Sequence, residues 1–250
     1  MSLRHDEWLA GAAGRVRLSV TDRFGGRSRP PYDGANLGGH VGDDQHSVEG
    51  NRRELAELLG LEPGRLVFMN QVHGAHVVQV DGPWDGAAPE ADALVTTTGG
   101  LGLAVLVADC VPVLLADPAA GVLGVAHAGR PGLRSGVVTR AVEAMRDLGA
   151  RSVTARLGPS VCRRCYAVPA DMRAEVAAVA PVAFAVDRHG QPALDVAAGV
   201  LGQLAPFCDD LDQLPGCTRE SADLYSHRRE GVTGRFAGVA TLWPAGEADR

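Results

Sequence analysis

Two apolar runs, separated by only three residues, constrain the fold of this chain most strongly. Residues 103–108 (LAVLVA) and 112–116 (PVLLA) contain no charged side chain, and a third apolar run, 121–126, follows closely. A strand with one face in water alternates apolar and polar residues, whereas a strand buried on both faces is continuously apolar. The pattern therefore predicts a sheet that is covered on both faces, within a layered α/β protein.

Further strands and helices are expected on either side of these runs. Residues 133–148 give the clearest helix, because Val137, Ala141 and Met145 are among the apolar residues that recur along one face. Residues 21–45 are rich in Gly and Pro and form a long loop of the kind that usually has a function. The other predictions are strands at 15–20, 65–69, 76–80, 92–96, 152–157 and 235–242, and helices at 47–59, 170–179 and 194–205. We expect a single domain over residues 1–250.

The composition argues against several classes of function. The 250 residues carry 24 Lys and Arg against 30 Asp and Glu, a net charge of −6, whereas binding nucleic acid requires a basic face. No apolar run reaches the length of a membrane helix, and the polar start at 1–7 is unlike a secretory signal. We expect a cytoplasmic protein with no membrane or nucleic-acid partner. A homo-oligomer is compatible with these properties.

Three potential metal ligands come at or just after the ends of apolar runs. His73 lies in the segment 70–74 (NQVHG), Cys110 follows the run 103–108, and His127 follows the run 121–126. Two imidazoles and one thiolate could hold a zinc ion and leave one coordination position open, as catalytic zinc sites do. The alternatives are a histidine that only donates hydrogen bonds and a cysteine that packs as a small apolar residue.

Asp109 and the other cysteines have several interpretations. Asp109 could orient a metal-bound histidine, or it could cap a turn. Cys162 and Cys165 form a C-x-x-C motif, which suggests a redox pair or a structural zinc site. No second C-x-x-C follows, and the spacing of Cys208 and Cys217 does not fit a zinc ribbon, so we expect two ordinary thiols. The segment 226–231 (SHRREG) is either a solvated turn or an anion clamp.

Taken in order, these segments resemble the laccase-domain (YfiH-like) family, described both as multicopper polyphenol oxidases and as purine nucleoside phosphorylases. The resemblance runs from about Thr21 to Leu242. Matching segments are 36–38 (NLG), 40–44 (HVGDD), 51–52 (NR), 70–74 (NQVHG), 91–96 (ADALVT), 108–115 (ADCVPVLL), 127–129 (HAG), 157–160 (LGPS), 165–166 (CY), 225–231 (YSHRREG) and 233–235 (TGR).

The resemblance implies a fold, a site and an activity. The fold is a four-layer αββα sandwich of the α/β (α+β) class, and His73, Cys110 and His127 are the zinc ligands and catalytic residues. Zinc is the expected cofactor, with copper as the alternative. The implied activities are phosphorolysis of adenosine, inosine and methylthioadenosine, and deamination of adenosine. The small-molecule partners are therefore purine nucleosides and phosphate.

Five further residues are candidates for substrate binding under this hypothesis. Arg52 and Arg228 are expected to contact phosphate, and Asn36, Asn70 and Gln71 to hydrogen-bond the nucleoside. One departure affects the same site. Where the family reads His-Ala-Gly-Trp-Arg-Gly, this chain has Arg130 and Pro131 in place of Trp and Arg. We expect Arg130 to supply the positive charge from one residue earlier.

Three other functions compete with the phosphorylase hypothesis. One is a metal-free amide hydrolase that edits peptidoglycan precursors, with Cys110 as nucleophile and His127 as base. Another is copper-dependent phenol oxidation, although three good ligands and few Met residues fall short of a multicopper cluster. A binding module without catalysis is the weakest, since an ionisable triplet serves no purpose there.

Overall fold

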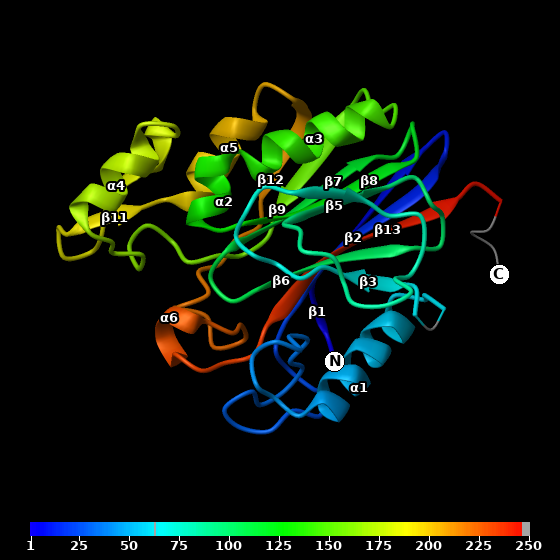
Figure 1. Ribbon diagram of the computed structural model, residues 1–250, viewed down its shortest axis with the longest axis horizontal. Coiled ribbons are helices and arrows are strands. Elements are labelled where there is room, and N and C mark those ends of the chain that lie inside the picture. Colours follow the sequence, from blue (N-terminus) through cyan, green and yellow to red (C-terminus); the bar gives the residue numbers. More distant parts are fainter. Residues whose placement is uncertain (63, 247–250) are drawn as a thin grey trace.

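Two β-sheets stacked face to face form the centre of the protein, with helices on both outer faces (Figure 1). The structure, a computed structural model, describes residues 1–62 and 64–246. The five-stranded sheet has the order β1 (Leu3–Gly11), β2 (Gly14–Thr21), β13 (Phe236–Pro244), β6 (Gly102–Val107) and β3 (Leu66–Phe68). The six-stranded sheet has the order β12 (Cys208–Gln213), β9 (Val153–Leu157), β7 (Val111–Asp117), β8 (Val122–Ala128), β5 (Ala93–Thr96) and β4 (Val77–Gln79).

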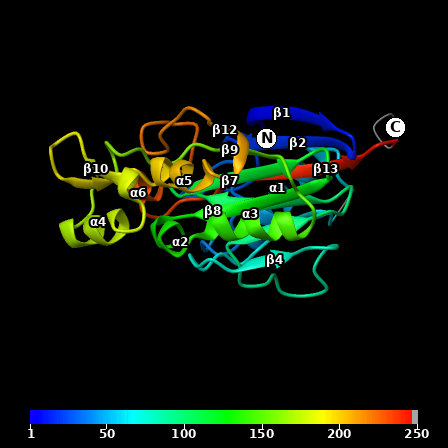
Figure 2. The same cartoon turned by 90° about the horizontal axis from the view of Figure 1, so that it is seen from above.

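The helices complete the four layers. Helix α1 (Gln45–Leu58) packs on the outer face of the five-stranded sheet. The outer face of the six-stranded sheet is covered by α2 (Arg130–Ser135), α3 (Val137–Asp147) and α5 (Val196–Leu204). Seen from above, α4 (Ala170–Ala177) and the small hairpin of β10 (Phe184–Val186) and β11 (Pro192–Leu194) lie beyond one end of the sheets (Figure 2). A short 3₁₀ turn (Pro181–Ala183) and α6 (His227–Glu230) are the remaining elements.

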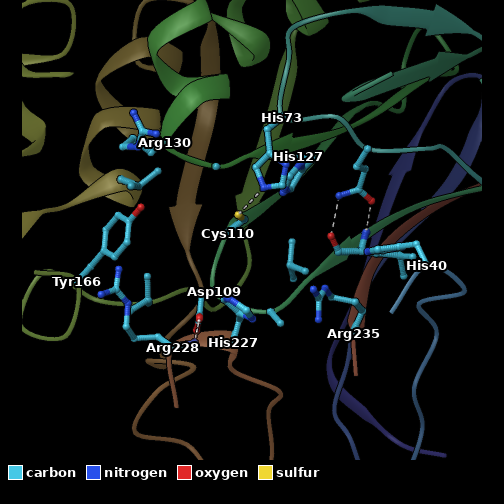
Figure 3. A pocket seen from close by; sticks show the side chains of 17 residues that line it. His40, His73, Asp109, Cys110, His127, Arg130, Tyr166, His227, Arg228 and Arg235 are labelled. Carbon is cyan, nitrogen blue, oxygen red and sulfur yellow. Dashed lines mark hydrogen bonds between the residues drawn. The ribbon is translucent and has the colours of Figure 1, made fainter. Parts of the chain in front are cut away.

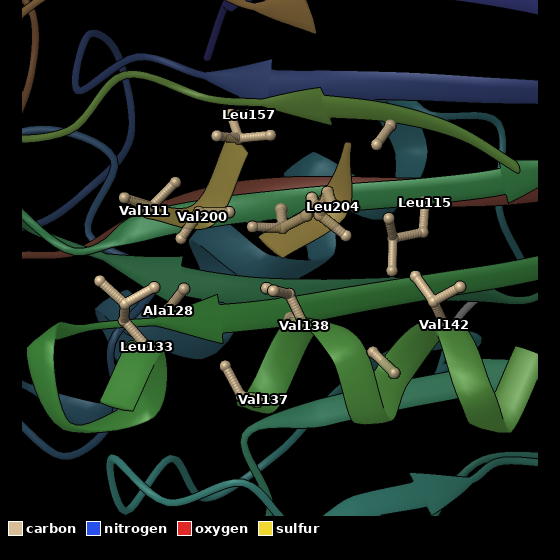
Figure 4. Packing of buried hydrophobic residues seen from close by; sticks show 14 of the residues in the cluster. Val111, Leu115, Ala128, Leu133, Val137, Val138, Val142, Leu157, Val200 and Leu204 are labelled. Atoms are coloured by element: carbon tan, nitrogen blue, oxygen red, sulfur yellow. The ribbon is translucent and has the colours of Figure 1, made fainter. Parts of the chain in front are cut away.

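Successive side chains of the central strands point to opposite faces of their sheets, so they pack into three separate hydrophobic cores. In β7, Val111, Val113 and Leu115 face the helices, while Leu114 and Ala116 face the other sheet. Figure 4 shows the first of these cores, where the strands meet α3 and α5. Because both faces of β7 pack against apolar layers, the strand has no polar alternation. The expected αββα sandwich, formed as a single domain, is confirmed.

The segment that carries Cys110 is the passage between the two sheets. Strand β6 belongs to the five-stranded sheet and β7 to the six-stranded sheet, and only residues 108–110 join them. His127 lies in the neighbouring strand β8, where it is paired with Pro112 of β7. The two strands therefore bring Cys110 and His127 to the same end of the sandwich.

Four features differ from the sequence predictions. The helix expected at 133–148 is two helices, because Gly136 adopts a left-handed conformation (φ 74°) between α2 and α3. Strand β1 was not predicted, since it is an edge strand whose charged residues stay partly exposed. Strand β12 and the β10–β11 hairpin were also missed, because they are short and largely polar or isolated.

No helix in the described residues combines the length and apolar character needed to cross a membrane.

Asp117 gives a test of how the turn after β7 is held. Its carboxylate is 1% exposed and accepts hydrogen bonds from the backbone N–H groups of Ala119, Ala120, Arg151 and Ser152 at 2.7–3.0 Å. Burial raises the pKa of Asp117, but these four N–H groups outweigh it and hold the pKa below its usual value. The carboxylate therefore joins the turn after β7 to the start of β9.

We expect Asp117→Ala to lower the free energy of unfolding by about 2–4 kcal/mol, because four backbone donors lose their acceptor. Since folding lowers the pKa of Asp117, its contribution is complete above the unfolded value of about 4 and is lost as the pH falls below it. Urea unfolding across this pH range measures both effects, with exposed Asp85→Ala as the control. An equal stability of the two variants at neutral pH would contradict the assignment.

Candidate functional site

A cavity of about 370 Å³ opens beside His73, Cys110 and His127 (Figure 3). Its wall combines apolar side chains with several cationic ones. The residues that line it are His40, Gln71, His73, Leu106, Val107, Ala108, Asp109, Cys110, His127, Gly129, Arg130, Val161, Tyr166, Val196, His227, Arg228 and Arg235. A cavity of this size and mixed character is typical of small-molecule sites.

The three predicted ligands come together in this cavity. One donor atom from each of His73, Cys110 and His127 lies within 4.8 Å of the others. The Sγ atom of Cys110 is 3.8 Å from Nε2 of His73, and the two imidazole rings meet edge to face with centroids 4.6 Å apart. Two donors on one tetrahedral zinc ion lie about 3.3–3.8 Å apart, so the separation of Cys110 Sγ from His73 Nε2 is close to that of two donors on one metal ion.

The backbone is unusual beside two of the three ligands. Among the described residues, His73 (φ 60°) and Asp109 (φ 103°) are the two non-glycine residues with positive φ. Such conformations cost free energy and persist where the surrounding structure enforces them. At Gly129 the constraint is space, because a Cβ atom there would lie 3.0 Å from both Cys110 Sγ and the His73 ring. The local backbone is therefore shaped around the triplet.

Asp92, which sequence reasoning did not single out, holds two of the ligands in place. Its fully buried carboxylate accepts hydrogen bonds from His127 Nδ1 at 2.8 Å and from the backbone N–H groups of His73 at 3.0 Å and Gly74 at 2.6 Å. Because Nδ1 of His127 is hydrogen-bonded to Asp92, Nε2 is the ring nitrogen that remains free to bind a metal ion together with Cys110. The available signal was an acidic residue at the start of an apolar strand, 92–96.

The electrostatics of the site favour a thiolate. Burial raises the pKa of the Cys110 thiol, but the charge of His127 and hydrogen bonds from both imidazoles lower it to about 6. Burial lowers the pKa of His127, and the opposing charges of Cys110 and Asp92 raise it to about 9. Cys110 is thus held as a thiolate at neutral pH, the form that binds metal and also the form that acts as a nucleophile.

Asp109 has the turn-capping role rather than the histidine-orienting one. Its carboxylate accepts hydrogen bonds from Thr218 Oγ1 (2.6 Å), Ser226 Oγ (2.7 Å) and the backbone N–H of Arg228 (2.6 Å). These contacts join the β6–β7 passage to the start of α6. Asp92, and not Asp109, is the carboxylate that hydrogen-bonds a histidine of the triplet.

Three arginines surround the cavity. Arg130 and Arg228 lie on either side of the Tyr166 ring, and Arg235 lies across the cavity near His40 (Figure 3). The guanidinium carbon of Arg228 is 5.0 Å from the centre of the Tyr166 ring. Arg130, which stands where the family has Trp, is the first residue of α2 and faces the cavity. The segment 226–231 therefore contributes to a positively charged wall.

The other candidate substrate-binding residues have different positions. Gln71 lines the cavity, but its amide is occupied on both sides by the backbone of Leu106 at 2.7 and 2.8 Å. Asn36 is fully buried and accepts a hydrogen bond from the backbone N–H of Arg235 at 2.8 Å. Neither Asn36, Arg52 nor Asn70 is part of the cavity wall.

Arg52 and Asn70 contact other parts of the chain. The Arg52 guanidinium stacks 4.0 Å from the Phe68 ring centre, and its Nε donates to Leu37 O at 2.8 Å. Asn70 is exposed and forms a β-bridge with Glu90. Sequence reasoning missed His40, His227, Tyr166 and Arg235 as lining residues, although all four fall in or beside the matching segments.

The fold and the His–Cys–His group define an αββα protein with a candidate metal site at one end of its sheets. A family of sequences described as multi-copper polyphenol oxidoreductase laccase matches residues 17–243, and the chain belongs to this family. A purine nucleoside phosphorylase of Streptomyces coelicolor is 58% identical over 231 residues, which cover 91% of this chain and 96% of that protein.

Solved structures are similar over nearly the whole chain. The Neisseria meningitidis protein NMB0706 gives a TM-score of 0.85 at 32% identity, covering 97% of this chain and 100% of that one. The YfiH protein of Bacillus licheniformis gives a TM-score of 0.84 at 28% identity, covering 91% and 92%. These likenesses agree with the four-layer fold.

Replacing Asp92 tests whether it organises the ligands. We expect Asp92→Asn to weaken zinc binding by roughly 10–100-fold, as loss of a carboxylate behind a metal-bound histidine typically does. Competition against a chromogenic chelator measures the affinity, and Asp147→Asn on the exposed side of α3 is the control. An unchanged affinity in Asp92→Asn would show that the carboxylate does not position the ligands.

Proposed function

We propose that this protein is a cytoplasmic, zinc-dependent purine nucleoside phosphorylase that acts on adenosine, inosine and methylthioadenosine and also deaminates adenosine. The observation that carries the proposal is the meeting of three donor atoms within 4.8 Å at a cavity lined by Arg130, Arg228 and Arg235. The name of the Streptomyces coelicolor relative supports the same activity.

The donor set suits zinc. His73 and His127 would each donate an imidazole nitrogen and Cys110 a thiolate, which leaves a fourth position open to substrate or water. A zinc ion held there would supply Lewis-acid polarisation of the purine or of water. Copper is the alternative metal, and the family description supports it. The group of clustered donors holds one Cys and two His, fewer than a multicopper cluster requires.

Phosphorolysis needs cations near the attacking anion. A phosphate oxygen forms a bond to C1′ of the ribose, the bond from C1′ to N9 of the purine breaks, and the base leaves as it gains a proton. Guanidinium groups bind phosphate through paired N–H donors, so Arg130, Arg228 and Arg235 would hold and orient it. The guanidinium of Arg52 stacks on Phe68 and lies outside the cavity wall, so in this proposal Arg235 contacts phosphate and Arg52 does not.

The remaining wall would hold the nucleoside. Leu106, Val107 and Val196 offer apolar contacts to the purine, and Tyr166 offers an aromatic ring beside Arg228. Gln71 keeps the Leu106 backbone in place through its two hydrogen bonds. Adenosine deamination would use the same cavity, with water adding at C6 of the purine and ammonia leaving. That reaction does not need phosphate.

A metal-free amide hydrolase is the second candidate function. The observation in its favour is the chain of contacts from Asp92 through His127 to Cys110, which resembles an activated cysteine nucleophile with its base and orienting carboxylate. A chelator would leave this activity intact, and it would act on amide substrates such as peptidoglycan precursors.

Product analysis distinguishes these functions. We expect wild-type protein to convert inosine and phosphate to hypoxanthine and ribose 1-phosphate, and to lose this activity when zinc is removed. Cys110→Ala removes a ligand and should lower the rate by at least about 100-fold, whereas half-buried Cys208→Ala should retain it. Full nucleoside cleavage in Cys110→Ala would refute the proposal. Chelator-resistant amidase activity would favour the hydrolase.

The arginine wall is tested by comparing the two reactions in one variant. We expect Arg228→Ala to raise the KM for phosphate by about tenfold or more, because a hydrogen bond to a charged group contributes roughly 1.5–3 kcal/mol. Adenosine deamination should change little, since it uses no phosphate. Exposed Arg140→Ala on α3 is the control. An equal loss of both reactions in Arg228→Ala would contradict a phosphate-binding role.

A further inference from the structure

A second group of metal-binding side chains lies outside the His–Cys–His triplet. Cys162, Cys165, Cys217 and Glu220 each offer a donor atom, and these four atoms lie within 4.8 Å of one another. Cys162 and Cys165 are free thiols, as expected, but the expectation did not include the neighbouring Cys217 and Glu220. It rested on the spacing of a zinc ribbon, whereas here the third cysteine arrives through a parallel β-bridge between Ser160 and Cys217.

The group is enclosed on most sides. Cys165 is 2% exposed and Cys217 is 8% exposed, while Cys162 is partly buried and Glu220 faces the solvent. All three cysteines are free thiols. Three sulfur atoms held together inside a protein are well suited to a soft or borderline metal ion, and zinc is the one most often held by three cysteines and a fourth ligand.

Polar groups around the cluster match a negatively charged metal centre. The backbone N–H of Cys162 donates to Cys217 Sγ at 3.4 Å. The Arg188 guanidinium donates to Cys165 Sγ at 2.6 Å and also pairs with the Glu220 carboxylate. Three thiolates and one carboxylate around a divalent cation give a net charge of −2, and Arg188 reduces it to −1. Such outer contacts orient ligands and stabilise their charge.

We propose that Cys162, Cys165, Cys217 and Glu220 hold a structural zinc ion. Four protein ligands would complete a tetrahedral site with no open position, which distinguishes a structural zinc from a catalytic one. A disulfide between two of the cysteines is the main alternative, but it would give Glu220 and Arg188 no role.

The site would join a segment of the cavity wall to the segment that hydrogen-bonds Asp109. Cys162 and Cys165 are the first and last residues of a turn between Val161 and Tyr166. Val161 and Tyr166 both line the cavity. Cys217 precedes Thr218, whose hydroxyl donates to Asp109 at 2.6 Å and whose N–H donates to Ser160 O at 3.1 Å. The zinc would therefore hold Tyr166 and the Asp109 network in register without contacting the reacting atoms.

Metal counting tests the proposal on the whole chain. We expect about two zinc ions per chain in wild-type protein, and one fewer in both Cys162→Ser and Cys217→Ala, by elemental analysis and native mass spectrometry. Cys208→Ser, which lies outside both groups, should keep two. Cys110→Ala should lose only the zinc of the triplet, so failure of either site is recognised separately.

Thiol labelling of the wild-type protein keeps the test independent of variants that fold poorly. With zinc bound, Cys162, Cys165 and Cys217 should resist a maleimide, and a strong chelator should expose these three thiols to it. Two zinc ions remaining in Cys217→Ala would overturn the proposal. The proposal would also be overturned if the protein were 2 Da lighter under non-reducing conditions and peptide mapping found a disulfide between two cysteines of this group.

Discussion

The candidate site depends on one buried carboxylate. Asp92 accepts hydrogen bonds from the His127 ring and from the backbone N–H groups at the His73 turn, so one anion positions two of the three ligands. Burial raises the pKa of Asp92, but its hydrogen bonds with His127, Gly74 and His73 lower it below the usual value, so it stays ionised. An unpaired buried carboxylate would be costly, and these donors are what make it stable.

The two stacked sheets deliver the third ligand. Cys110 lies in the three-residue passage from β6 to β7, where the chain leaves one sheet and enters the other. Asp109 adopts a positive φ in that passage, and its hydrogen bonds to Thr218, Ser226 and the Arg228 backbone hold it there. The same contacts attach α6 and its arginines to the cavity. A segment whose backbone is unfavourable in isolation is thus stabilised by groups more than 100 residues away.

The sequence allowed some of this to be predicted and left the rest hidden. The runs 103–108 and 112–116 indicated buried strands because their periodicity is local, and ordered motifs brought His73, Cys110 and His127 together. Asp92 was missed and Cys217 was set aside for its spacing, because their partners are 35 and 55 residues distant along the chain. Asn36 was assigned to substrate, yet its side chain binds the Arg235 backbone. Motif matching finds residues near a site but does not show which of them face the cavity.

The central claim is that the triplet held by Asp92 binds one zinc ion. Crystals of the zinc-loaded protein, measured on both sides of the zinc absorption edge, test it directly. The account predicts an anomalous peak bonded to Nε2 of His127, to a ring nitrogen of His73 and to Sγ of Cys110, with Asp92 still hydrogen-bonded to Nδ1 of His127. No peak at this position, or a zinc ion bonded to Asp92 in place of His127, would contradict it.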